Sequence, residues 1–140
     1  MSAIADDGER RPCSGRNFRV EIDEGNGRRV EVGCSEVVFP ALGALRDAWA
    51  PGTVEPLLLR RAATGDALFH AWWAKARHGR PPRRRTVHIT LLGDDLAGER
   101  LHWRFRSARP LSLHYSPLNA MGNALLIETL ALAFDEVEIG

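Results

Sequence analysis

The chain has 140 residues, 44% of them hydrophobic, and its 19 basic and 18 acidic side chains give a formal net charge of +1. This length can bury one core, and the near-neutral balance excludes a strong long-range field for polyanions. The two cysteines, Cys13 and Cys34, are too few for a disulfide framework and form no Cys-x-x-Cys pair, so we expect reduced thiols.

The first sixteen residues are polar and mix acidic with basic side chains. They contain no apolar signal core, and no stretch of the chain reaches the roughly 18 apolar residues needed to cross a bilayer. We therefore expect a flexible N-terminal arm over residues 1–16, a single domain over 17–140, and a soluble protein made in the cytoplasm.

The N-terminal part of the domain predicts a hairpin. Apolar residues alternate over 17–23, Asn26-Gly27 favours a tight turn, and alternation resumes from Val30 to Cys34. Residues 40–53 show no clean period and are interpreted as a connecting loop with at most a short helical turn. A strand is expected over 54–61, where Pro56 favours an edge position or a strand start.

One helix is expected over about residues 66–78. Thr64 or Asp66 can cap it, and Gly79 followed by Pro81-Pro82 ends it. Its apolar side chains fall within an arc of about 140° on a helical wheel, which predicts packing against a sheet. They are Leu68, Phe69, Trp72, Trp73 and Ala76.

The C-terminal half predicts more strands. Alternation over 87–91 and 101–105, joined by residues 93–98, is typical of a hairpin, and a shorter strand is expected over 110–115. Residues 123–134 are ambiguous, because their propensity favours a helix while their residues can also fill a strand that is apolar on both faces. The pattern alone favours a helix.

No catalytic, cofactor-binding or metal-binding motif is found. Glycine-rich phosphate loops are absent, the serines have no nucleophile-elbow context, and no two histidines have metal-ligand spacing on a helix. His88 and His102 could face each other on neighbouring strands, where solvent-facing neighbours are the commoner explanation. We expect no cofactor, no metal and no enzymatic activity.

A run of basic residues lies between the predicted helix and the next strand. It could contact phosphates, but Pro81-Pro82 breaks the helix before most of the arginines, and Trp72 and Trp73 belong to the apolar face. A solvated turn or a protein interface is the preferred interpretation, with a nucleic-acid-binding module as the alternative. The run comprises Lys75, Arg77, Arg80, Arg83, Arg84 and Arg85.

Several short blocks occur in a characteristic order. They are NFRVEI at 17–22, VGCSEV at 32–37, LRR at 59–61, TGD at 64–66, WW at 72–73, RRTVHI at 84–89, WRFRSA at 103–108, LNA at 118–120, Asn123, and IETL at 127–130. In this order the chain resembles the T-even phage tail-tube family, which includes the inner-tube proteins of extracellular contractile injection systems.

The resemblance implies a small antiparallel β-barrel or sandwich with one flanking helix over residues 17–140, and it makes 123–134 a strand. It also implies six-membered rings that stack into the inner tube of a contractile phage tail or injection particle. The tube forms a channel that is driven through a target envelope. Expected partners are other copies and the sheath, baseplate and tube-terminator proteins, with no membrane in the resting state and no specific nucleic acid. Assembly would take place in the bacterial cytoplasm.

The sequence departs from the family pattern at residues 40–53, where family members carry a longer charged hairpin. This shortening favours a variant of the function, in which the chain is a paralogue placed at the baseplate or tube end. The rivals are the nucleic-acid-binding module and a hydrolase or metal enzyme built on the barrel. The expected subunit interface combines the arginines of the turn, the apolar residues of the shortened loop and the C-terminal acids. These candidates are Arg83, Arg84, Arg85, Leu42, Leu45, Trp49, Asp135, Glu136 and Glu138.

Overall fold

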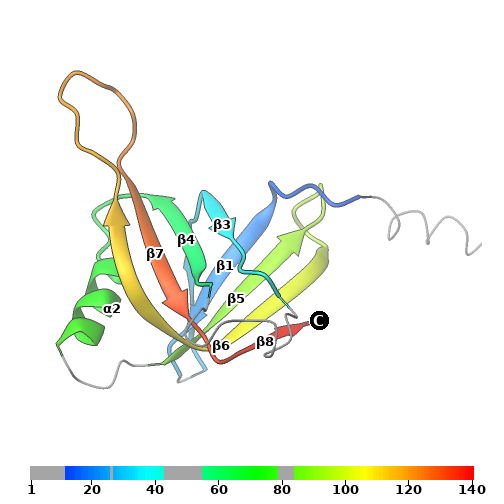
Figure 1. Ribbon diagram of the computed structural model, residues 1–140. Helices are drawn as coiled ribbons and strands as arrows, with labels where there is room; N and C mark the ends of the chain where they lie inside the picture. Colours follow the sequence, from blue (N-terminus) through cyan, green and yellow to red (C-terminus); the bar gives the residue numbers. More distant parts are fainter. Residues whose placement is uncertain (1–11, 26, 43–54, 79–83) are drawn as a thin grey trace, which may run out of the picture.

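The computed structural model describes residues 12–25, 27–42, 55–78 and 84–140. Strands dominate, and one helix lies beside the C-terminal half of the longest strand (Figure 1). In chain order the elements are β1 (Phe18–Asp23), β2 (Arg29–Val32), β3 (Glu36–Val38), β4 (Leu57–Ala62), α2 (Leu68–Arg77), β5 (Arg85–Leu92), β6 (Glu99–Tyr115), β7 (Ile127–Ala133) and β8 (Glu136–Ile139).

The strands form one antiparallel sheet in the order β2-β1-β5-β6-β7-β4-β3, and β8 pairs with β6. Strand β6 belongs to both halves of the sheet, because its first part pairs with β5 and β8 and its last part pairs with β7. It bends where Ser107 takes a left-handed φ of 57° and the register shifts between Pro110 and Ser112. Such irregularities bend a strand, and here they turn the two halves of the sheet toward each other.

The core lies between these two halves. Period-2 alternation places one face of β1 and β4 inward, whereas β5 and β7 are buried on both faces along much of their length. Branched aliphatic side chains from strands far apart in sequence therefore meet there. The fully buried core side chains include Ile22, Leu57, Leu59, Val87, Phe105, Leu130 and Leu132.

The helix contributes the largest core residues. Phe69 and Trp72 are buried, and Leu68 and Trp73 pack against the same cluster, as the helical wheel predicted. Asp66 accepts a hydrogen bond from the backbone N–H of Leu68 at 2.9 Å. The predicted stop at Gly79 and Pro81-Pro82 lies outside the described residues.

The mainly β class with one helix is confirmed. The sheet is not closed into a barrel: among the described residues, β2 and β3 end it without pairing with each other. The strand expected over 110–115 is the end of β6, the 54–61 strand is described as Leu57–Ala62, and 127–133 is a strand, so the helix favoured by propensity alone is wrong. No helix among the described residues is long and apolar enough to cross a membrane.

Candidate subunit interface

Residues 116–126 connect β6 to β7 and project away from the body of the molecule (Figure 1). We call this segment the arm. Two hydrogen bonds close its base: the Ser116 N–H donates to the Ile127 carbonyl at 2.9 Å, and the Ile127 N–H donates to Ser116 Oγ at 2.8 Å. The arm is therefore a closed loop whose two ends are held together, the arrangement of a compact Ω-loop.

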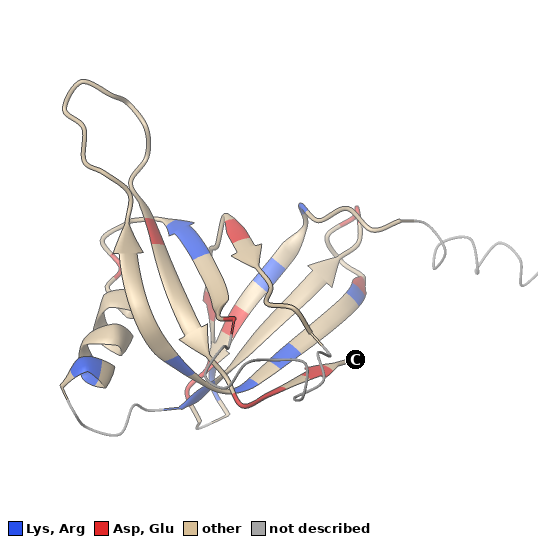
Figure 2. Cartoon of the chain, in the orientation of Figure 1, with Lys and Arg blue, Asp and Glu red and all other residues tan. Residues whose placement is uncertain are grey.

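The tip of the arm is shaped by Asn119. Its side-chain Oδ1 accepts from the Met121 N–H at 3.0 Å, and its carbonyl accepts from the Gly122 N–H at 3.1 Å. Leu118, Met121 and Leu125 are 85%, 95% and 73% exposed. The whole arm lacks charged residues, as Figure 2 shows. Large apolar side chains that are exposed together on one short uncharged loop favour a protein contact.

The foot of the arm rests on a buried ion pair. Arg61 Nε donates to Glu128 Oε1 at 2.5 Å, and the guanidinium also donates to the Asp66 carbonyl at 3.1 Å and lies 4.2 Å from the centre of the Phe69 ring. Burial raises the pKa of Tyr115, and the Glu128 carboxylate raises it further. Strand β4, the entry to α2 and the start of β7 are thereby joined directly beneath the arm.

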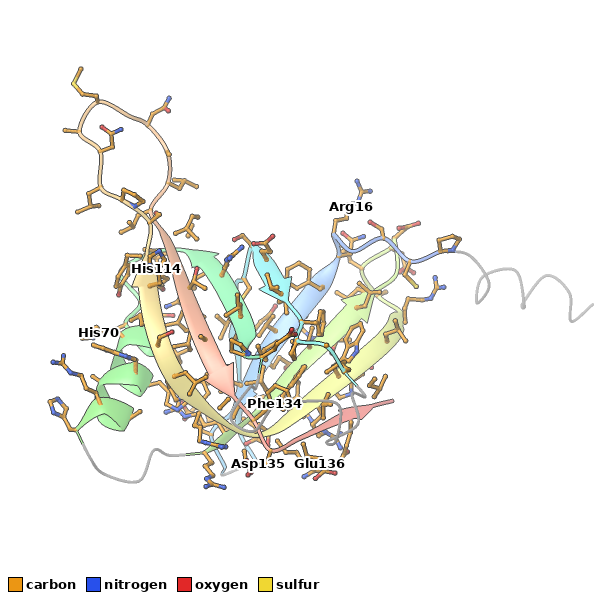
Figure 3. The ribbon with its side chains drawn as sticks, in the orientation of Figure 1. Arg16, His70, His114, Phe134, Asp135 and Glu136 are labelled. Carbon is orange, nitrogen blue, oxygen red and sulfur yellow. The ribbon has the colours of Figure 1, made fainter. Side chains whose placement is uncertain are left out.

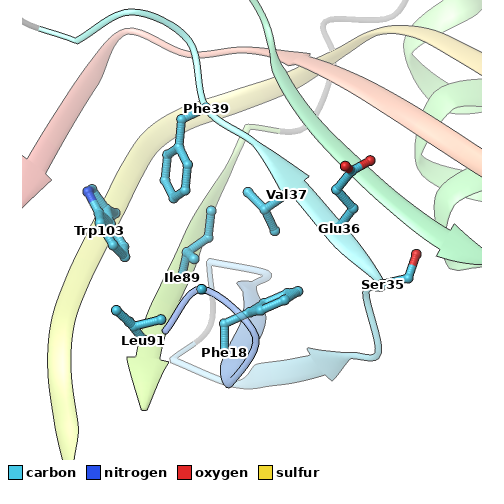
Figure 4. Close-up of a pocket in the computed structure, with 9 residues that line it drawn as sticks. Phe18, Ser35, Glu36, Val37, Phe39, Ile89, Leu91 and Trp103 are labelled. Carbon is cyan, nitrogen blue, oxygen red and sulfur yellow. The ribbon is translucent and has the colours of Figure 1, made fainter. Parts of the chain in front are cut away.

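An apolar pocket of about 230 Å³ opens between β3 and the strands β1, β5 and β6 (Figure 4). It lies where the two halves of the sheet diverge. The rings of Phe39 and Trp103 stand 4.8 Å apart at its edge. Its lining also includes Gly15, Phe18, Val37 and Leu91.

A cluster of ion pairs occupies the corner formed by the β7–β8 turn, β6 and the start of β5. Arg84 and Arg109 lie 3.0 and 2.9 Å from Asp135. Glu138 lies 2.6 Å from Arg106 and 3.1 Å from Arg104. Hydrogen bonds from Arg109 and Arg106 lower the pKa values of Asp135 and Glu138, respectively. We call this cluster the charged corner; Figure 3 labels Asp135 and Glu136 there.

The structure gathers part of the predicted interface and disperses the rest. Arg84, Asp135, Glu136 and Glu138 lie together at the charged corner. Leu42 instead packs against the core of its own chain. Arg83, Leu45 and Trp49 lie outside the described residues.

The expectation that Arg85 projects from the turn is wrong. Its guanidinium lies 4.8 Å from the centre of the Trp72 ring, its side chain is buried, and its Nη1 is 4.0 Å from Glu24. Arg85 begins β5 on the same face as Val87, so strand alternation turns it inward.

The arm was missed by sequence reasoning. The signal available was a run of eleven uncharged residues between two strands, with leucines and a methionine among turn-forming residues. A local pattern indicates that such a loop exists. It does not indicate where the loop points, because that depends on how β6 and β7 pair.

The two histidines considered as strand neighbours do lie together. His88 Nδ1 is 3.2 Å from His102 Nε2, and the rings stack. Burial lowers the pKa of His88 to about 4. Within the part of the chain that the structure describes, no group of three or more His, Cys, Asp or Glu side chains could hold a metal ion. Burial raises the pKa of the Cys34 thiol to about 12, so this thiol is unreactive.

Solved structures share this fold. A chain of the anti-feeding prophage (AFP) baseplate, 6-fold symmetrised, is 17% identical with a TM-score of 0.74, over 92% of this chain and 95% of that chain. A chain of the PVC sheath-tube complex in the extended state is 16% identical with a TM-score of 0.71, over 97% and 96%. Hcp1 from Flavobacterium johnsoniae is 13% identical with a TM-score of 0.55, over 88% and 94%.

No curated protein matches the chain. The model of the family described as T4-like virus tail tube protein gp19 matches residues 46–138, which is more than half of the chain. The matched range begins after the blocks at 17–22 and 32–37 and contains all the later ones. The chain therefore belongs to the T4-like tail tube protein family.

Proposed function

We propose that this tail-tube subunit forms six-membered rings that stack into the inner tube of a contractile phage tail or phage-tail-like injection particle, and that it has no catalytic role. Membership of the tail tube family makes the chain a structural tube subunit. The ring, the stacking and the absence of catalysis are the proposed steps beyond that membership.

The observation that carries the proposal is the exposed apolar arm on an open sheet. Strands β2 and β3 end the sheet, so each has one edge that no described strand covers. Open edges and exposed apolar loops are aggregation hazards in an isolated molecule, and a closed ring of identical subunits removes both. This chain therefore has the features of a subunit that is completed by its neighbours.

The nucleic-acid alternative receives less support. Of the six residues of the basic run, Arg85 is buried and Arg84 is paired with Asp135. Arg77 lies over the Trp73 ring, at 5.4 Å from its centre. Backbone phosphates are bound by basic side chains that are free to face them, and these contacts occupy three of the six.

The similar structures include a baseplate and a sheath-tube complex. By analogy, this chain would meet a sheath around the tube, a baseplate at one end and a terminator at the other, with assembly in the bacterial cytoplasm. A subunit placed only at a tube end is the variant to test, because a chain from a baseplate has the same fold.

Negative-stain electron microscopy of the purified protein, with light scattering across a concentration series, tests the proposal. Six-fold rings or hollow tubes are expected. Tubes of many rings would indicate the main tube subunit, and single rings would indicate an end subunit. A protein that stays monomeric at high concentration, and also when purified tube ends are supplied as templates, would contradict the proposal.

A further inference from the structure

We infer that the arm of one copy docks into the apolar pocket of a second copy, with Leu118 and Met121 as the inserted side chains. This inference rests on the proposed function and specifies the contact that joins the subunits. It concerns two surfaces that the structure places on one chain.

The arm points away from the pocket of its own molecule. Ser35 and Glu36 line the pocket and also line a second hollow that reaches Ser116 and Pro117 at the base of the arm. From that base the arm projects beyond the end of β6 and away from the body of the molecule (Figure 1). Its side chains Leu118 and Met121 are 85% and 95% exposed, so they do not fill the pocket of their own chain. With the arm in this conformation, an arm that fills the pocket comes from another molecule.

The two surfaces match in size and chemistry. The pocket holds about 230 Å³. Apolar cavities of roughly 150 Å³ already admit a molecule as large as benzene, so a leucine or methionine side chain fits. The carboxylate of Glu36 at the pocket's edge is neutralised by Arg60 at 2.6 Å. An uncharged arm can therefore enter the pocket without burying the Glu36 carboxylate unpaired.

The arm is also prepared for docking. Its base is closed by the two hydrogen bonds between Ser116 and Ile127, and Asn119 fixes the turn at its tip. A preorganised loop loses little conformational entropy on binding. Methionine and aromatic residues are enriched in interface cores, and here Met121 would meet Phe39 and Trp103.

An arm-to-pocket contact is heterologous, because two different surfaces meet. Heterologous contacts produce closed rings or open stacks. In either assembly each subunit inserts its own arm into one neighbour and binds the arm of another neighbour in its pocket. A heterologous contact agrees with the proposed ring. It also predicts that a variant with a defective arm and a variant with a defective pocket bind each other, which a contact between two arms does not predict.

The test combines two defective variants. The arm variant carries Leu118→Asn and Met121→Asn. The pocket variant carries Gly15→Phe, which places a large side chain at the rim of the pocket, where an added Cβ meets nothing within 4 Å. Each variant alone should need about thirtyfold or more higher concentration than the parent to assemble, the loss typical of removing an interface hot spot. Mixed in equal amounts, the two variants should form a dimer of twice 15.5 kDa. The intact arm of the pocket variant binds the intact pocket of the arm variant, and the defective arm and pocket that remain cannot add a third subunit.

Controls separate docking from folding. Leu96→Asn changes a leucine that is 62% exposed on the β5–β6 turn, and asparagine tolerates its left-handed φ of 62°; this variant should assemble like the parent. Both test variants should keep the parent's melting temperature. Phe39→Asp provides a second pocket variant if the phenylalanine at position 15 turns outward.

A cross-link tests the contact without weakening it. In a Cys13→Ser, Cys34→Ser background, protein carrying Met121→Cys is mixed with protein carrying Phe39→Cys and oxidised. A disulfide between the two molecules is expected, and Leu96→Cys in place of Met121→Cys should give none. Normal assembly by the arm variant, no dimer in the mixture, or no cross-link would overturn the inference. Rings formed equally well by the parent and the arm variant would contradict the arm-to-pocket contact but not the proposed function. A parent protein that never assembles would contradict both.

Discussion

Arg61 and Glu128 form an ion pair that is buried at the foot of the arm, with side chains only 5% and 6% exposed. The adjacent residue of β4, Arg60, forms an ion pair of similar length with Glu36, but those side chains are 39% and 55% exposed. Residues 60 and 61 of β4 therefore allow a buried ion pair to be compared with a solvated one. The cost of removing one partner should differ strongly, because a buried charge left alone is not rehydrated.

Arg61→Ala should lower the free energy of unfolding by about 3–5 kcal/mol, the usual loss when one member of a buried pair is removed. Glu128→Ala should cost a similar amount. The double variant should cost less than the sum, because it leaves no buried charge unpaired; Asp66, which also loses its 3.3 Å ion pair with Arg61, has a side chain that is 59% exposed. Urea denaturation of all three variants measures these differences.

Arg60→Ala is the matched control and should cost no more than about 1 kcal/mol, as exposed pairs usually do. Equal losses at positions 60 and 61 would contradict the assignment of a structural ion pair beneath the arm.

Trp72→Ala should destabilise the fold by about 3–5 kcal/mol, because it removes a large, fully buried side chain and leaves a cavity. Lys75→Ala, on the exposed face of the same helix, should change stability by less than about 0.5 kcal/mol. Thermal or urea melting measures both. An unchanged Trp72→Ala would mean that the helix packs through another face.

The strand β1 was predictable because one of its faces is more buried than the other. β7 was not predictable from pattern alone, since Leu130, Ala131 and Leu132 are all buried and the period disappears. The family resemblance, not the pattern, identified it as a strand.

Short strands were missed because long-range pairing alone creates them. β8 has four residues, and its register opposite β6, with Glu138 facing Arg104, depends on the bend of a distant strand. The sequence predicts a separate strand that begins at Pro110, but β6 continues through this residue. The left-handed Ser107 and the register shift after Pro110 bend the strand there without ending it.

Part of the candidate interface lies where the sequence did not predict it. The arginines of the turn were expected to pair with the C-terminal acids of a neighbouring subunit, whereas in the structure Arg84 pairs with Asp135 of its own chain. The inward position of Arg85 could have been found by extending the alternation of β5 backward from Val87. The arm could not, because its function as a contact depends on projection from the sheet.

His88 should make the fold sensitive to acid. Its pKa is lowered from 6.5 to about 4, first by burial and then by Arg29, His102 and Arg104, with Glu21 opposing them. Between these two pH values the unfolded chain binds a proton at this site and the folded chain does not. Stability is therefore unaffected by His88 above about pH 6.5 and falls as the pH drops toward 4, with a slope of up to about 1.4 kcal/mol per pH unit.

Urea denaturation from pH 7.5 to 4 compares the parent with His88→Gln. The carboxylates contribute equally to both proteins, so the difference between the two curves isolates the histidine. The variant should lose stability less steeply below pH 6.5, while His114→Gln, an exposed control, should follow the parent. Parallel curves for the parent and His88→Gln would contradict the buried, neutral state of His88.

Charge reversal at Arg84 tests whether the charged corner belongs to the subunit interface. Arg84 and Asp135 are 58% and 46% exposed, so their pair contributes little to the stability of the monomer, and Asp135 keeps Arg109 when Arg84 is lost. Arg84→Glu should therefore leave melting almost unchanged. If a neighbouring subunit faces this corner, assembly should weaken substantially, because like charges placed together at an interface cost several kcal/mol.

Glu136→Lys in the same chain should restore part of the assembly. It is a cleaner compensating change than reversal of Glu138, which already accepts hydrogen bonds from Arg104 and Arg106. Lys75→Glu is the matched control, since it changes the net charge equally from the exposed face of α2. Both reversals would reduce any binding to DNA at low salt, whereas only Arg84→Glu should reduce assembly in light scattering and electron microscopy. Normal assembly by Arg84→Glu would make the charged corner a solvated surface, and equal effects of the two reversals would show that net charge, not the corner, governs association.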